Sequence, residues 1–420
     1  MFDPVLMGCL ILCVIAALWV TEWIHVSMTA LLVPVLAIVT GIFDVKQAFS
    51  AFANPIIFIF LGGFALSAAL HKQQLDKRIA QTILSIAAGR LSHAANLIFV
   101  TTAVLSMWIS NTATAAMMLP LTLGVLSALD SAKHRRTYLF FLLGIAFSAN
   151  IGGIGTLVGS PPNAIAAAAV GLSFTGWMIV ALPVVVILMP VMIFTLRYTC
   201  RPDLSQRVEY EAAKLPPLNK TQIMTLLVFG LTVAGWIFSK PLAAALNISS
   251  GIDAVVAVTA ILLLSALRLL DWKELSAQTD WGILLLFGGG LTLSALLSAS
   301  GASGFIAQNI INMIEHTPLL VFVVCLILFV MVLTAVASNT ASAALLLPIF
   351  LPLAEGVGLG QTGLAILIAI GASCAFTLPV ATPPNAIVFG SGFVPQKEML
   401  RVGSLLSVVV LPILVGVGLS

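Results

Sequence analysis

Residues 110–120 read SNTATAAMMLP, and residues 338–348 read SNTASAALLLP, 228 positions further along the chain. Extended to 104–120 and 332–348, the two stretches align without a gap and are identical at ten of 17 positions. A Ser-Asn-Thr cluster is expensive in so apolar a setting, because hydroxyl and amide groups need partners there. Two copies in the same setting indicate that the chain contains an internal duplication.

Two further motif pairs extend the duplication. SPPNAI at 160–165 matches TPPNAI at 382–387, and GGFALSA at 62–68 matches GGLTLSA at 289–295. The order is kept in both halves: the glycine pair, then SNT, then PPN. Matched interruptions in two repeated halves are typical of secondary transporters.

The composition predicts that the chain lies in a membrane. Of the 420 residues, 60% are hydrophobic and only 8% are charged, and the mean hydropathy is +1.16. Soluble domains carry roughly 25% charged residues. A water-soluble domain is therefore excluded, and we expect an all-α polytopic membrane protein.

Apolar stretches of about 20 residues, the length that crosses a ~30 Å hydrocarbon core, mark about ten transmembrane helices. They lie near 4–20, 27–42, 54–70, 137–150 continuing to 170, 173–197, 221–239, 252–270, 281–298, 362–378 continuing to 392, and 402–419. Two longer stretches, 94–129 and 318–354, hold the SNT clusters at their centres, and we predict re-entrant hairpins there. Arms of 94–109 and 113–129 could also span the membrane fully, which leaves an external turn at SNT as the alternative.

The positions of Lys and Arg predict the orientation. If each SNT stretch returns to the side it came from, 16 of the 18 basic residues fall on one face, and only Lys46 and Lys240 fall on the other. We therefore expect the basic loops on the cytoplasmic side of an inner (plasma) membrane. The same parity makes the two SNT stretches enter from opposite sides, so the halves form inverted repeats.

Both motifs are typical of helix starts. Ser, Asn and Thr are favoured N-caps, and Pro is favoured at the first helical position, as in SPPN and TPPN. Each half thus offers two helix N-termini, whose exposed N–H groups suit carboxylates and other oxyanions. Neutral hydrogen-bonding side chains add to these N–H groups: Ser110, Asn111, Thr112, Ser338, Asn339 and Thr340.

The same turns offer oxygen ligands for a cation. Ser106 and Thr334 each precede the SNT cluster by one helical turn, so two hydroxyls share one helix face in each hairpin. Hydroxyl, amide and freed carbonyl oxygens suit a small hard cation such as Na⁺. The glycine-rich segment before the first PPN would let carbonyls turn inward around Gly159, and its counterpart does so with Pro379 and Ala381.

Two observations bear on two alternatives, a purely structural role for the SNT clusters and coupling to protons. An isolated SNT cluster is more often a contact between helices, but its duplication beside a duplicated PPN argues against that role here. The motif blocks contain no Asp, Glu, Lys, Arg or His. A proton-driven carrier would be expected to keep an ionisable group there, so coupling to sodium is favoured.

With these motifs the sequence resembles the divalent anion:sodium symporter family of dicarboxylate, citrate and sulfate transporters. The resemblance rests on the paired SNT and (S/T)PPN motifs, on FLGGFALSAAL at 60–70, and on LWVTEWIHVSMTALLVP at 18–34, which is similar to the family's W-x-T-E segment. It covers essentially the whole chain.

The resemblance implies a homodimeric elevator-type transporter. A scaffold would comprise 1–91 and 221–315, and a transport domain would comprise 92–199 and 316–420, with a cytoplasmic linker at 200–220. Two sodium sites are implied by motif position, with substrate carboxylates between the two SNT tips, near Ser160 and Thr382. The first sodium site would use Ser106, Ser110, Asn111 and the Gly159 carbonyl, and the second Thr334, the Ala337 carbonyl, Asn339 and the Ala381 carbonyl.

We therefore expect a sodium-coupled importer of small di- or tricarboxylates, with the C4-dicarboxylates succinate, malate and fumarate first. A sodium-independent dicarboxylate exchanger and a sulfate or citrate carrier remain open, because neutral donors suit all of these anions. An anion channel would need a continuous polar or basic stripe, and an enzyme would need a nucleophile paired with His or Asp at membrane depth. We see neither pattern, and we expect Na⁺ as the coupling ion, no cofactor and no nucleic-acid partner.

Overall fold

The computed structural model describes residues 3–85, 90–206, 216–314 and 317–419, and the elements assigned within them are helices. Seven helices in these ranges are long and apolar enough to cross a membrane. The predicted all-α membrane protein is thereby confirmed. Of the predicted linker 200–220, residues 207–215 lie outside the described residues.

The two halves contain the same series of helices. In the first half these are α1 (Pro4–Thr21), α2 (Val26–Val39), α4 (Pro55–Lys72), α6 (Leu91–Ser106), α7 (Asn111–Leu126), α8 (Arg135–Gly153), α9 (Pro161–Val170) and α10 (Phe174–Cys200). In the second half, in the same order, they are α11 (Lys220–Ile237), α13 (Ile252–Ala266), α15 (Trp281–Ala299), α17 (Leu319–Val336), α18 (Asn339–Phe350), α19 (Gln361–Ser373), α20 (Pro383–Gly390) and α21 (Gln396–Leu419). Each predicted span and each predicted hairpin corresponds to members of this series.

Short helices join these elements, and the sequence pattern did not indicate them. They are α3 (Val45–Ser50), α5 (Leu75–Ser85), α12 (Ser239–Ala245), α14 (Trp272–Gln278) and α16 (Ala302–Ile314), with 3-10 turns η1 (Ala51–Ala53), η2 (Leu351–Leu353) and η3 (Pro379–Ala381). None of these five α-helices is long enough to span a membrane.

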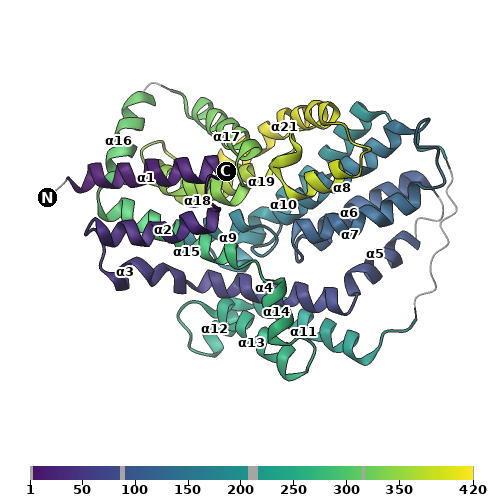
Figure 1. Cartoon of the computed structure of the whole chain (residues 1–420), viewed down its shortest axis with the longest axis horizontal. Helices are drawn as coiled ribbons and strands as arrows, with labels where there is room; N and C mark the ends of the chain where they lie inside the picture. Colours follow the sequence, from purple (N-terminus) through teal and green to yellow (C-terminus); the bar gives the residue numbers. More distant parts are fainter. Residues whose placement is uncertain (1–2, 86–89, 207–215, 315–316, 420) are drawn as a thin grey trace.

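The halves pack through reciprocal contacts. Helix α4 packs on α13 while α15 packs on α2, and α8 packs on α20 while α19 packs on α9. Each of these pairs joins one half to the other, and exchanging the halves turns each pair into its counterpart. Figure 1 shows the resulting interleaving, with α21 lying beside α10 and α19 beside α8. The predicted inverted repeats therefore share one helical body.

The duplicated glycine pairs allow the closest of these contacts. A Cβ atom on Gly62 would lie 2.7 Å from the Cβ of Ala257, and one on Gly289 would lie 2.5 Å from the Ala30 carbonyl oxygen. Both distances are too short for any side chain. The glycines are therefore packing positions that let α4 approach α13 and α15 approach α2.

Candidate functional site

One cavity of about 720 Å³ brings the duplicated motifs together. Both SNT tips and both PPN helix starts line it, although they come from four separate stretches of the chain. All eight residues predicted to meet the substrate are among its lining residues: Ser110, Asn111, Thr112, Ser160, Ser338, Asn339, Thr340 and Thr382. Two hairpin tips that meet in one internal cavity have the arrangement of re-entrant hairpins, and an external turn would not produce it.

The first hairpin turns between α6 and α7. Ser110 is the N-cap of α7, and its hydroxyl accepts a hydrogen bond from the Ala113 N–H at 3.2 Å. One turn earlier, the fully buried hydroxyl of Ser106 lies 2.5 Å from Asn111 Oδ1 and 2.8 Å from the Ala149 carbonyl oxygen. A hydroxyl has only one proton, so Ser106 cannot donate to both oxygens at once.

The second hairpin repeats this geometry. The buried hydroxyl of Thr334 lies 2.6 Å from Asn339 Oδ1 and 2.8 Å from the Ala372 carbonyl oxygen. Again two acceptors compete for one proton. The two SNT tips therefore present equivalent groups of oxygen atoms, each built from a hydroxyl, an amide and a main-chain carbonyl.

The Asn111 amide is surrounded by further oxygens. With its amide turned, Nδ2 donates to the carbonyl oxygens of Ala149 and Gly159, both at 3.2 Å, and to the Ser106 hydroxyl oxygen at 2.5 Å, which leaves the Ser106 proton for the Ala149 carbonyl. In the unturned orientation Oδ1 faces those same oxygens. Oxygens that face one another at these distances need either a donor or a cation among them. The predicted sodium ligands Ser106, Asn111 and Gly159 are thus brought together.

The remaining predicted ligands of the second site lie at the same cavity. Ala337 precedes the second SNT cluster, and Ala381 ends the η3 turn before the second PPN; both line the cavity together with Asn339. Thr334 lies behind them in α17, hydrogen-bonded to Asn339. Each predicted residue therefore lies at or directly behind the cavity wall.

The asparagine of each PPN motif holds a broken helix in shape. Fully buried Asn163 donates through Nδ2 toward the carbonyl oxygens of Gly153, Ile154 and Thr156, at 2.8, 3.2 and 2.7 Å. Asn385 does the same toward the carbonyls of Ala375 and Leu378, both at 3.0 Å. These bonds satisfy carbonyls freed where the helix is interrupted.

A polar contact between the halves lies at the middle of the site. Asn150 Nδ2 lies 3.2 Å from the Thr382 hydroxyl and 3.3 Å from Asn385 Oδ1, and the Ser373 hydroxyl lies 3.5 Å from that of Ser160. Asn150 follows Ala149 just as Ser373 follows Ala372, so the two contacts are counterparts. Each joins a broken helix of one half to the PPN start of the other.

The electrostatics of the cavity favour anions on one side. Helices α7, α9, α18 and α20 all begin at its wall, and helix N-termini carry partial positive charge. The cavity is also lined by ionisable side chains from outside the motif blocks: Glu22, His25, His71 and Asp280. His71 also pairs with Asp76, with 2.8 Å between Nδ1 and Oδ2.

Sequence reasoning missed four kinds of participant. Asn163 and Asn385 stand inside the PPN motifs, but their side chains were assigned no role there. Asn150 and Ser373 differ in residue type, so the repeat did not reveal them. The carbonyls of Ala149 and Ala372 carry no side-chain signal, and the four ionisable residues belong to segments without a repeated motif.

Comparison with known proteins agrees with this architecture. A sequence profile described as citrate transporter matches residues 16–358 and 252–419. The chain is 49% identical over 419 residues to an "uncharacterized transporter" of Haemophilus influenzae, which covers 98% of this chain and 90% of that protein. It is 33% identical over 448 residues to the sodium-dependent dicarboxylate transporter SdcS of Staphylococcus aureus, with 97% and 86% coverage.

Two solved structures share the fold. One is the YdaH transporter of Alcanivorax borkumensis, with a TM-score of 0.63 and 12% identity, covering 100% of this chain and 98% of that one. The other is MtrF of Neisseria gonorrhoeae, described as one of a class of antimetabolite efflux pumps, with a TM-score of 0.60, 13% identity, and 100% and 94% coverage. Both are transporters, and at this identity they bear on the fold alone.

Proposed function

The chain belongs to the citrate transporter family, which is related to the divalent anion:sodium symporters, and from this premise we propose that it imports small di- or tricarboxylates together with Na⁺. C4-dicarboxylates such as succinate, malate and fumarate are the first substrates of the proposal. The similarity to sodium-dependent dicarboxylate transporters over nearly the whole chain supports it. The protein is a membrane transporter and not an enzyme.

The observation that carries the proposal is the pair of equivalent oxygen groups at the hairpin tips. At each tip a buried hydroxyl lies within 2.8 Å of an asparagine amide and of a main-chain carbonyl oxygen. Hydroxyl, amide and carbonyl oxygens are neutral hard ligands that suit Na⁺. The doubling of the group supports two sodium sites.

The first sodium site in this proposal uses Ser106, Ser110, Asn111 and the Gly159 carbonyl, and the second uses Thr334, Asn339 and the carbonyls of Ala337 and Ala381. The distances add the carbonyls of Ala149 and Ala372 as candidate ligands. Asn111 and Asn339 stand both at the oxygen groups and at the cavity wall. Each can therefore give its oxygen to a cation and its N–H₂ to a carboxylate.

The substrate of the proposal lies between the two tips, beside Ser160 and Thr382. Four helix N-termini and the hydroxyls of SNT supply donors for two carboxylates. The acidic residues Glu22 and Asp280, which also line the cavity, would repel a dianion. Two sodium ions beside the tips would offset that repulsion, which gives a physical reason for coupled entry.

The movement is also part of the proposal. We infer that 92–199 and 316–420 move together as a transport domain against a scaffold of 1–91 and 221–315, in a homodimer whose basic loops face the cytoplasm. The packing of α8 on α20 and of α19 on α9 supports joint movement, because these contacts join the two parts of the transport domain to each other. The dimer rests on the family resemblance.

Uptake of radiolabelled succinate into proteoliposomes tests the function. An inward Na⁺ gradient should drive accumulation, while an equal K⁺ gradient with or without a proton gradient should not. An exchanger would behave differently: uptake without sodium, driven only by unlabelled dicarboxylate on the trans side, would overturn the coupling we propose. Empty liposomes and proteoliposomes of the Asn309→Asp variant, altered far from the cavity, serve as controls.

A further inference from the structure

A second cavity, of about 880 Å³, lies where α8 and α21 begin and α10 ends. Helices α10 and α21 are both long and apolar enough to span a membrane, so their ends mark a boundary between membrane and water. Four arginines line this cavity: Arg135, Arg136, Arg201 and Arg401. All four side chains are exposed.

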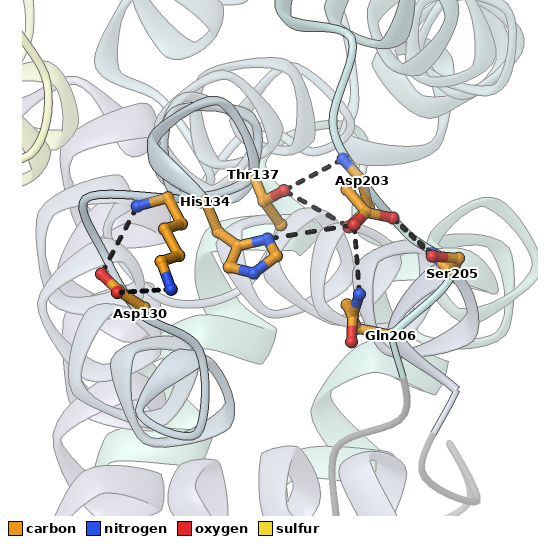
Figure 2. A network of polar contacts seen from close by, with 7 residues as sticks. Asp130, His134, Thr137, Asp203, Ser205 and Gln206 are labelled. Carbon is orange, nitrogen blue, oxygen red and sulfur yellow. Dashed lines mark hydrogen bonds and ion pairs between the residues drawn. The ribbon is translucent and has the colours of Figure 1, made fainter.

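A local network of polar contacts fixes the position of one of these arginines. Arg201 ends α10 in the left-handed conformation, with φ of 47°, and the chain then turns back toward the start of α8. The Thr137 hydroxyl donates to the Asp203 carbonyl at 3.3 Å and accepts from the Asp203 N–H at 3.1 Å, as Figure 2 shows. The segment after α10 is thereby bound to α8, and Arg201 lies beside the arginines of α8.

The Asp203 side chain strengthens this turn. Its carboxylate accepts from the Ser205 hydroxyl at 2.6 Å and from the Ser205 N–H at 3.1 Å, and it also faces Gln206 and His134 (Figure 2). These hydrogen bonds lower the pKa of the Asp203 carboxyl below its usual value. The carboxyl is therefore charged at neutral pH, and the contacts that fix the turn are present there.

The cavity has an excess of positive charge. Arg401 is paired with Glu398, with 2.8 Å between the nitrogen and the oxygen. Among the described residues that line the cavity, Glu398 is the one carboxylate. Three arginines therefore line the cavity without an acidic partner in its wall, and their excess of positive charge favours an anion there.

The deeper wall of the same cavity is apolar. Leu405 and Val408 stand one and two turns beyond Arg401 on the same face of α21, and Leu139 stands one turn beyond Arg135 in α8. Val408 is 63% exposed, although it lies inside a membrane-spanning helix. The cavity is therefore positively charged at the helix ends and apolar further along the same helices.

We propose that this cavity binds an anionic phospholipid, with the phosphate diester held by Arg135, Arg136 and Arg201 and an acyl chain lying along Leu405 and Val408. Guanidinium groups form paired, charge-assisted hydrogen bonds with phosphate oxygens. A free phosphate would satisfy the arginines but would leave the apolar wall uncovered. The apolar continuation therefore favours a lipid as the source of the phosphate.

Native mass spectrometry of the purified full-length protein in detergent tests the proposal. Dioleoylphosphatidylglycerol should bind at least about tenfold more tightly than dioleoylphosphatidylcholine, which has the same chains but no net charge. Because each basic side chain near a membrane surface contributes about a fivefold gain in affinity for anionic lipid, Arg136→Gln and Arg201→Gln should each weaken binding about fivefold. Arg268→Gln, an exposed arginine elsewhere, should leave it unchanged.

Two further measurements distinguish a bound lipid from a bound free phosphate. Inorganic phosphate at millimolar concentration should fail to displace the bound phosphatidylglycerol, and Val408→Asn should weaken lipid binding. Equal binding of the two lipids, equal loss in Arg268→Gln and Arg136→Gln, or full displacement by phosphate would each overturn the proposal. A matching gel-filtration profile for every variant ensures that a loss of binding is not a loss of folding.

Discussion

At the scale of single residues, each hairpin tip places a buried hydroxyl between an asparagine amide and a main-chain carbonyl. Ser106 lies between Asn111 Oδ1 and the Ala149 carbonyl, and Thr334 lies between Asn339 Oδ1 and the Ala372 carbonyl. We propose that these oxygens bind Na⁺ and that the two asparagines connect the cation to the anion.

Asn111→Asp and Asn339→Asp should each lower the apparent affinity for succinate by about 100-fold or more. The substitution keeps size and an oxygen ligand but removes the donor, and a new charge facing a dianion costs about 3 kcal/mol or more at an effective dielectric constant near 20. Transport kinetics in proteoliposomes give the measurement, and some sodium binding should survive. Asn309→Asp, an exposed asparagine on α16, is the matched control.

The role assigned to these asparagines would be wrong if both variants transported succinate with the Michaelis constant of the unmodified protein. Residues that merely join two helices could accept the change in that way.

At the scale of elements, the sequence predicted the hairpins and the broken helices but not what holds them. Repetition of SNT and PPN located both interruptions, because Ser, Asn and Pro have strong preferences at helix starts. The role of Asn163 could not be predicted, since its three carbonyl partners are brought together only by the folded turn. Short helices such as α16 were missed because they have neither the length of a span nor a repeated motif.

Helix α8 offers a test of how closely its end must approach the first hairpin tip. A Cβ atom on Gly153 would lie 2.4 Å from Asn111 Oδ1, so Gly153→Ala should displace the Asn111 amide. We expect the sodium concentration for half-maximal uptake to rise about tenfold or more, which corresponds to about 1.4 kcal/mol. In α7, a Cβ on Gly124 would meet none of the described residues within 4 Å, so Gly124→Ala is the control.

Unchanged sodium dependence in Gly153→Ala, in protein that is as stable as Gly124→Ala, would show that the Asn111 position does not control cation binding.

The first hairpin tip can also be followed by chemical labelling. Ala113 is exposed and lines the cavity, so a cysteine there, in a background without the five native cysteines, should react with a small thiol reagent. Succinate together with Na⁺ should slow the reaction, because the substrate covers the tip. Ala341, its counterpart in the second hairpin, is only 2% exposed and is the less reactive position for comparison.

Rapid labelling of Ala113→Cys by a bulky impermeant reagent, with the same rate in the presence and absence of succinate and Na⁺, would instead favour a tip that lies outside the transport pathway.

At the scale of the whole molecule, the duplication explains most of the architecture. Two sequence-related halves of opposite orientation place equivalent motifs around one centre, which is why both SNT tips reach the same cavity. Reasoning from the repeat therefore predicted the long helices, their order and the eight motif residues that line the cavity. It could not predict that Glu22, His25, His71 and Asp280 line the same cavity, because these residues come from unrepeated positions and only the packing of the helices brings them there.

The central claim is that the two hairpin tips bind sodium and thereby permit the anion to bind. Titration calorimetry of the purified protein with succinate, at fixed ionic strength in NaCl or in KCl, tests this claim most directly. We predict binding in sodium with a Hill coefficient for Na⁺ above 1, little or no binding in potassium, and a sodium requirement raised about tenfold in Ser106→Ala and in Thr334→Ala, for about 1.4 kcal/mol each. Equal succinate affinity in sodium and potassium, unaffected by either substitution, would contradict it.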